Sequence, residues 1–85
     1  MPSKTVTVGS SVGLHARPAA IISEAAGELD AEVTLAVRGE EPVDASSSLL
    51  IMTLGAACGD QVEVASEDQA ALDTIAALVE KDLDA

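Results

Sequence analysis

One short segment of the sequence, Gly13-Leu14-His15-Ala16-Arg17-Pro18, gathers residues that could do chemistry. His15 is the only histidine of the chain. A neutral imidazole is a nucleophile near physiological pH, so it can accept a phosphoryl group. Arg17 carries a permanent charge and a fork of donors that matches phosphate oxygens. The segment therefore indicates an anion or phosphoryl site centred on His15.

A helix is predicted directly after this histidine, over Ala16–Ala26. Three of its apolar residues share one face: Ala19, Ile22 and Ala26. Pro18 fits such a helix only in its first turn, which places His15 at or next to the helix N-terminus. Free backbone N–H groups and the positive end of the helix dipole favour an anion there. We expect Ala16 and Arg17 to bind the phosphate.

The rest of the chain predicts further short elements. Alternating polarity predicts strands at Thr5–Val8, Glu32–Val37 and Gln61–Ala65, and a short strand at Val43. Helices are predicted at Ser46–Leu54, which Gly55 ends, and after a capping box at Ser66–Gln69. Gly27 is expected to cap the first helix. The last helix has one apolar face, formed by Leu72, Ile75, Ala76, Val79 and Leu83.

The predicted order is β-α-β-β-α-β-α, within a single domain over residues 1–85. This order indicates an α+β fold with helices on one face of a mostly antiparallel sheet. The fold must place the start of the first helix at the surface, because the candidate chemistry needs an accessible imidazole.

The composition excludes several classes of function. The chain has 15 acidic and 4 basic residues, a net charge of −11, which repels phosphate backbones and anionic membranes. It has no Phe, Tyr or Trp, the usual stacking platform for single-stranded nucleic acid. We therefore expect no nucleic-acid partner and no membrane association. With neither a signal peptide nor a spanning apolar run, a cytoplasmic location is predicted.

Other chemistries at His15 fit the residues less well. A metal site is disfavoured because His15 is the only histidine and Cys58 the only thiol; Cys58 is expected to be structural, and no cofactor is expected. A Ser-His-acid hydrolase would need a substrate cleft and a nucleophile-elbow motif, and no such motif is present. A single histidine is often structural or merely exposed, so the local residues leave an inert His15 open.

The segment around His15 resembles HPr, the histidine-containing phosphocarrier of the phosphoenolpyruvate-dependent sugar phosphotransferase system. The resemblance rests on Gly13–Ala19 and on Ser47–Gly55, which ends in Met52-Thr53-Leu54-Gly55, and it extends over nearly the whole chain. It implies an open-faced β-sandwich, with four antiparallel strands covered on one face by three helices. It also implies a carrier, and not a free-standing enzyme, that takes a phosphoryl group from Enzyme I on Nδ1 of His15. The carrier passes this group to the Enzyme IIA component of sugar permeases, with help from Arg17.

The resemblance also raises a second candidate site. Some members of this family carry a regulatory serine at the start of the second helix, and Ser47 aligns with it. A serine kinase and transcriptional regulators are therefore further candidate partners. The flanking Ser46 and Ser48 depart from the family pattern, and we interpret the three serines as helix caps.

The first helix also departs from the charge pattern of the HPr family. Many family members place basic residues along the first helix, where this chain has Glu24 and Gly27. Docking is therefore expected to use apolar side chains: Ala20, Leu49, Leu50 and Met52. A monomer is expected. A regulatory relative that only docks, and an interaction module with an inert histidine, are the competing hypotheses.

Overall fold

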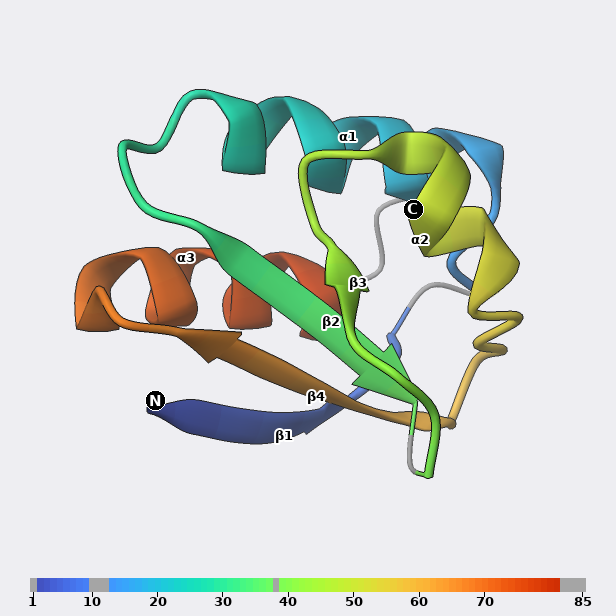
Figure 1. The fold of residues 1–85 in the computed structure, drawn as a ribbon. Helices are drawn as coiled ribbons and strands as arrows, with labels where there is room; N and C mark the ends of the chain where they lie inside the picture. Colours follow the sequence, from blue (N-terminus) through green and yellow to red (C-terminus); the bar gives the residue numbers. More distant parts are fainter. Residues whose placement is uncertain (1, 10–12, 38, 82–85) are drawn as a thin grey trace.

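We describe the protein from a computed structural model, over residues 2–9, 13–37 and 39–81 (Figure 1). Its strands are β1 (Ser3–Thr7), β2 (Val33–Val37), β3 (Val43–Asp44) and β4 (Gln61–Ser66). Its helices are α1 (Ala16–Gly27), α2 (Ser48–Thr53) and α3 (Gln69–Glu80). The predicted order β-α-β-β-α-β-α is confirmed.

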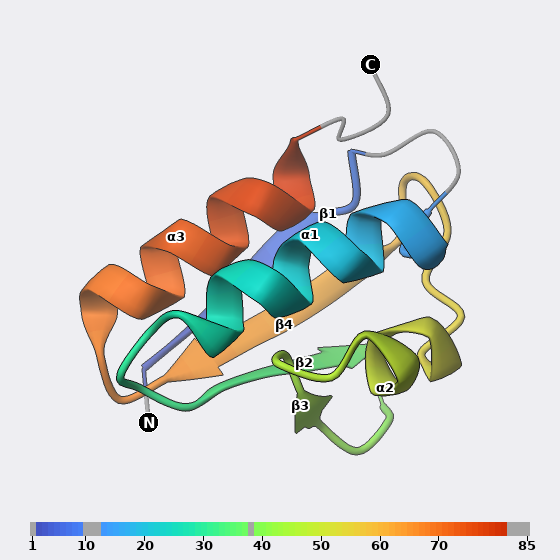
Figure 2. The ribbon, with the colours of Figure 1, turned by 90° about the horizontal axis from the view of Figure 1, so that it is seen from above.

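The four strands form one antiparallel sheet in the order β1-β4-β2-β3. The register places Val6 opposite Val62, and Leu35 opposite both Val64 and Val43. All three helices lie over one face of this sheet, and the other face is open (Figures 1 and 2). The predicted open-faced β-sandwich is therefore confirmed.

An aliphatic core fills the space between the sheet and the helices. The strands contribute alternate residues, among them Val6, Leu35, Val62 and Val64. The helices contribute Ala19, Ile22 and Ala26 from α1, Ile51 from α2, and Leu72, Ile75, Ala76 and Val79 from α3. Successive residues of a strand point to opposite faces of the sheet, whereas residues three or four apart share one face of a helix. Because burial of apolar area drives folding, these two spacings set which face of each element turns inward.

None of the helices within the described ranges has the length and apolar character needed to cross a bilayer.

The start of α3 differs from the predicted capping box. Ser66 is the last residue of β4, is fully buried and pairs with Val33, so it cannot serve as the cap. Asp68 is the N-cap instead, and its carboxylate accepts from the N–H groups of Ala70 at 2.9 Å and Ala71 at 3.4 Å. The sheet ladder continues one residue further than predicted and moves the cap along the chain. Leu83 lies outside the described residues.

The end of α1 also differs from the prediction. Gly27 is the last helical residue and does not adopt a positive φ. Glu28 is the C-cap in a right-handed conformation, and its N–H donates to the carbonyls of Glu24 and Ala25, both at 3.2 Å. By contrast Gly55, with φ of 66°, follows α2 in the left-handed conformation that a helix end favours. The cap at Gly27 is therefore wrong and that at Gly55 is confirmed.

Glu28→Lys should stabilise the protein. Glu24 and Glu28 place like charges four residues apart at the negative end of the α1 dipole, and the last turn of α1 holds no basic residue. We expect the free energy of unfolding to rise by about 0.3–1 kcal/mol in low salt, as measured by urea denaturation. The gain should shrink in roughly 1 M salt, where the screening length falls to about 3 Å.

Glu67→Lys is the matched control for this change. It alters the net charge equally, but it lies just before α3, where a negative charge is favourable. An equal gain in both variants would attribute the effect to net charge and contradict the dipole explanation.

Candidate functional site

His15 occupies the N-cap position of α1. Its backbone is extended, with φ of −87° and ψ of −162°, and its carbonyl accepts the N–H of Ala19 at 2.8 Å. Its side chain makes no capping hydrogen bond and is exposed. The structure therefore presents the imidazole to solvent at the helix N-terminus, as the sequence predicted.

The first turn of α1 provides donors for an anion beside this imidazole. Ala16 and Arg17 are the first two helical residues, and their N–H groups donate to no acceptor among the residues that the structure describes. Pro18 comes third, where its missing N–H removes no helical hydrogen bond. The turn holds no acidic residue that would compete with an anion.

Three consecutive exposed residues thus form the candidate phosphoryl site: His15, Ala16 and Arg17. The next two residues, Pro18 and Ala19, are buried and fix the helix against the core. Arg17 stands two residues from the imidazole and brings a full positive charge to the positive end of the helix dipole. The arrangement suits a nucleophile that must carry a dianionic group.

The residues just before His15 are held by the segment between α2 and β4. Leu14 is buried, and its N–H donates to the carbonyl of Ala56 at 2.9 Å. Gly13 has φ of 74°, and a Cβ there would lie 2.5 Å from the Ala56 oxygen and 2.9 Å from Cα of Ala57. This contact was not predicted from the sequence. The one sequence feature that could have indicated it is Gly13, a glycine two residues before the single histidine.

Three of the four predicted docking residues are exposed on α1 and α2. Leu49 is 68% exposed and Leu50 is 41% exposed on α2, whereas Met52 is half-buried and Ile51 belongs to the core. Ala20 is exposed on α1. Helix α2 lies beside the N-terminal half of α1 in both views (Figures 1 and 2). The structure therefore places exposed apolar side chains next to the helix that starts at His15.

Ser46 and Ser47 both make local hydrogen bonds at the start of α2. Ser47 is the N-cap, and its hydroxyl oxygen accepts the N–H of Leu50 at 3.3 Å. Ser46 donates to Oδ1 of Asp44 through its N–H at 2.9 Å and its hydroxyl at 2.7 Å. These two hydrogen bonds lower the pKa of Asp44, and the bond from the backbone N–H of Ser46 has the larger effect. The interpretation of Ser47 as a helix cap is confirmed.

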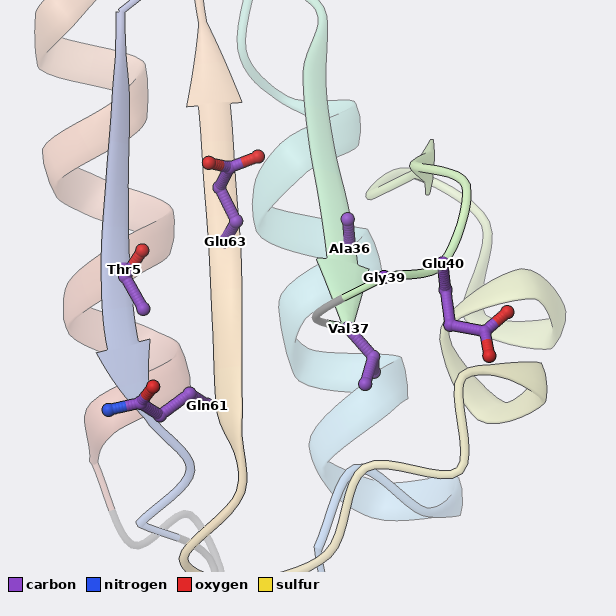
Figure 3. A pocket seen from close by; sticks show the side chains of 7 residues that line it. All are labelled: Thr5, Ala36, Val37, Gly39, Glu40, Gln61 and Glu63. Carbon is purple, nitrogen blue, oxygen red and sulfur yellow. The ribbon is translucent and has the colours of Figure 1, made fainter.

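A hollow of about 350 Å³ lies on the open face of the sheet, away from the helices (Figure 3). It is lined by Thr5, Ala36, Val37, Gly39, Glu40, Gln61 and Glu63. None of these residues belongs to the site predicted from the sequence. Within the described ranges, no group of three His, Cys, Asp or Glu side chains could hold a metal ion.

Cys58 differs from the sequence expectation. It lies in the turn before β4, and its side chain is exposed, so it takes no part in the core. The next residue, Gly59, has φ of 91°, which turns the chain sharply at the surface. A structural role for Cys58 is therefore wrong.

Comparisons with known proteins show which family the chain belongs to. Residues 2–81 match the family described as "PTS HPr component phosphorylation site". Phosphocarrier protein HPr of Streptomyces coelicolor is 40% identical over 87 residues, covering 99% of this chain and 94% of that protein. Phosphocarrier protein HPr of Treponema pallidum is 41% identical over 78 residues, covering 92% and 84%.

A solved structure gives the same result for the fold. The crystal structure of a phosphocarrier protein HPr from Bacillus anthracis is similar with a TM-score of 0.85 at 32% identity, covering 92% of this chain and 95% of that one. The fold, the exposed histidine at a helix start and these matches together lead to one conclusion: the chain belongs to the HPr family of phosphocarriers of the phosphotransferase system.

Proposed function

We propose that this chain accepts a phosphoryl group from phosphorylated Enzyme I on His15 and passes it to the Enzyme IIA component of sugar permeases. In this role it is a covalent carrier in phosphoenolpyruvate-dependent sugar uptake, acting in the cytoplasm as a monomer. One observation supports the proposal most: the exposed imidazole of His15 stands at the start of α1, beside backbone donors and Arg17.

The transfer needs only positioning and electrostatics from this chain. The lone pair of Nδ1 of His15 attacks the phosphorus, an N–P bond forms, and the bond to the donor group breaks as that group leaves with its electron pair. The imidazole ring loses a proton to solvent to give the neutral phosphoimidazole. The N–H groups of Ala16 and Arg17 and the guanidinium of Arg17 then face the phosphoryl oxygens.

The reverse attack delivers the group. A nucleophile on the acceptor forms a bond to phosphorus while the N–P bond breaks, the ring nitrogen takes the electron pair back, and the ring regains a proton from solvent. The carrier is then regenerated, so a single small site serves both partners in turn. Exposure of the site is essential, because each partner must reach the same phosphorus.

Docking in this proposal uses the apolar surface beside the site. The side chains of Leu49 and Leu50 expose apolar area to water, which is unfavourable for a monomer. Ala20 and Met52 add to this apolar surface. Glu24 adds a negative charge on α1 instead of the basic residues that many family members have there. Apolar contact therefore supplies more of the binding here than charge pairing does.

Ser47 is proposed as a regulatory site only in second place. A phosphoryl group on its hydroxyl would replace the acceptor that caps α2, and it would add negative charge to a chain whose net charge is already −11. A serine kinase and transcriptional regulators would be partners in that case. The intact His15-Ala16-Arg17 segment favours the carrier over a relative that only docks.

The wild-type chain tests the carrier proposal directly. Incubated with Enzyme I and phosphoenolpyruvate, it should gain the mass of one phosphoryl group in an acid-labile, alkali-stable linkage. Addition of Enzyme IIA should remove this mass from the chain. A chain that stays unmodified, or an acid-stable adduct, would contradict the proposal.

Arg17→Ala should slow the transfer while leaving the fold intact. The side chain is exposed, so the free energy of unfolding should change by at most about 0.5 kcal/mol. Loss of a cation that faces the transferring group should lower the transfer rate by about 10²-fold, measured by rapid-quench labelling. Arg17→Lys keeps the positive charge but lacks the forked guanidinium, so its transfer rate should lie between those of the wild type and Arg17→Ala. An unchanged rate in Arg17→Ala would remove Arg17 from the mechanism.

A further inference from the structure

The carboxylate of Asp60, 45 positions beyond His15 in the chain, accepts the N–H of Ala57, a residue that packs against Gly13 just before α1. We propose that Asp60 is a positioning residue for the phosphoryl transfer. It fixes the turn Ala57–Asp60. This turn binds Val8, just after β1, and together with the preceding Ala56 it contacts Gly13 and Leu14, just before α1. The inference rests on the proposed carrier function of His15.

The turn is closed by two hydrogen bonds between its first and last residues. Oδ2 of Asp60 accepts the N–H of Ala57 at 2.9 Å, and the N–H of Asp60 donates to the carbonyl of Ala57 at 3.0 Å. Gly59, with φ of 91°, allows the tight reversal between them. The side-chain bond is the part of this closure that depends on the identity of residue 60.

The last two residues of the closed turn bind Val8, which follows β1. The N–H of Val8 donates to the carbonyl of Asp60 at 2.9 Å, and the N–H of Gly59 donates to the carbonyl of Val8 at 3.0 Å. Val8 is itself buried, so the chain just after β1 is fixed both by packing and by a pair of backbone bonds.

Ala56, the residue before the turn, contacts the residues just before α1. The carbonyl of Ala56 accepts the N–H of Leu14, the neighbour of His15, at 2.9 Å. Gly13 packs so closely on Ala56 and Ala57 that no side chain would fit there. Figure 2 shows this segment beside the start of α1. A shift of Ala57 would therefore displace the backbone that contacts Gly13 and Leu14, and with them the neighbouring His15.

Asp60→Ala removes the bond to the Ala57 N–H and leaves the backbone bonds of residue 60 available. We expect Enzyme I to phosphorylate this variant with kcat lowered about fivefold, because small displacements of a reacting group slow transfer strongly. KM should stay within about twofold of the wild type, since the docking residues on α2 are untouched.

Asp60→Asn tests whether the hydrogen bond or the charge is responsible. Its amide oxygen can still accept from Ala57, so its kcat should return close to the wild-type value. A loss in Asp60→Asn equal to that in Asp60→Ala would assign the effect to the charge and overturn the proposal.

Asp68→Ala is the matched control for loss of stability. Asp68 is another exposed aspartate that accepts backbone N–H groups, and it caps α3 at the end of the molecule away from the start of α1 (Figure 2). It should lower the free energy of unfolding and leave kcat unchanged. If Asp68→Ala lowers kcat as much as Asp60→Ala does, general destabilisation explains the result and the positioning role is overturned.

Spectroscopy separates this inference from the carrier proposal. In Asp60→Ala, the imidazole resonances of His15 should shift and the Leu14 amide should exchange faster with solvent, whereas Asp60→Asn and Asp68→Ala should resemble the wild type. A wild-type chain that takes no phosphoryl group would defeat the carrier proposal, and with it the role of Asp60 in transfer. Wild-type transfer with unchanged kcat and unchanged His15 resonances in Asp60→Ala would defeat the role of Asp60 alone.

Discussion

His15→Ala should carry no phosphoryl group after incubation with Enzyme I and phosphoenolpyruvate, yet it should unfold at nearly the same denaturant concentration as the wild type. The imidazole is exposed and makes no capping hydrogen bond, so its removal deletes little packing. The change in free energy of unfolding should stay within about 0.5 kcal/mol, measured in urea. The loss of labelling should be complete, because the chain has no second imidazole.

His15→Asn sharpens this test, because it should make the protein more stable while it abolishes transfer. Asparagine is among the best N-cap residues, and histidine does not cap here. Pro18 has no N–H, so the new side chain would accept from Arg17. The gain should be about 0.5–1 kcal/mol, by comparison with other cap substitutions.

Two results would contradict the assignment. Labelling that persists in both variants would place the phosphoryl group on another residue. A large loss of stability in His15→Ala would show that the imidazole supports the fold, which would favour the structural interpretation of this histidine. A His15→Ala chain that is unlabelled and as stable as the wild type is the outcome that supports the carrier.

Gly13→Ala should have the second large effect, on stability and on transfer together. Gly13 has φ of 74°, where an L side chain is strained by about 1–2 kcal/mol. The new Cβ would also lie 2.5 Å from the Ala56 oxygen, an overlap with backbone that should add about 1–3 kcal/mol. The sum is a large share of the stability of a small domain, and it should appear as a lower midpoint in urea.

The overlap should also displace the residues next to His15. Leu14 could keep its bond to the Ala56 carbonyl only if the two segments move apart. We expect the folded fraction of Gly13→Ala to accept phosphoryl groups about tenfold more slowly than the wild type, since reaction rates fall steeply when a nucleophile is misplaced.

Gly27→Ala is the control for the glycine substitution. Gly27 lies at the end of α1 with no atom within 4 Å of a Cβ, and its φ is not positive. This variant should be more stable by about 0.5–1 kcal/mol, because alanine loses less backbone entropy in a helix. A harmless Gly13→Ala would show that the contact with Ala56 and Ala57 is loose, and that the segment does not fix the histidine.

Local rules worked where one segment decides its own structure. The position of Pro18 set the start of α1 and therefore the place of His15, because a proline interior to a helix would remove a hydrogen bond and clash. The serines before α2 were identified as caps on the same kind of argument, and Ser47 does cap that helix. Composition alone favoured an aliphatic core, since the chain has no aromatic residue.

Local rules failed at three positions, and at the first of them a distant segment competes. Ser66 has the sequence of a helix cap, but pairing with Val33 draws it into β4, and Asp68 takes over the cap. Gly27 has the sequence of a helix end, but α1 continues through it in a right-handed conformation to Glu28. Cys58, expected to be structural, is exposed because the turn that contains it lies at the surface.

The sequence by itself determined where the proposed nucleophile and its cation lie and which elements carry them, because His15, Arg17 and Pro18 lie next to one another at a helix start and local geometry relates them. It also determined the order of the strands and helices through their periodicity. Only the tertiary structure decided what holds this turn in place. Ala56, Ala57 and Asp60 are remote from His15 in the chain, and no local pattern states which backbone groups will meet once the sheet forms.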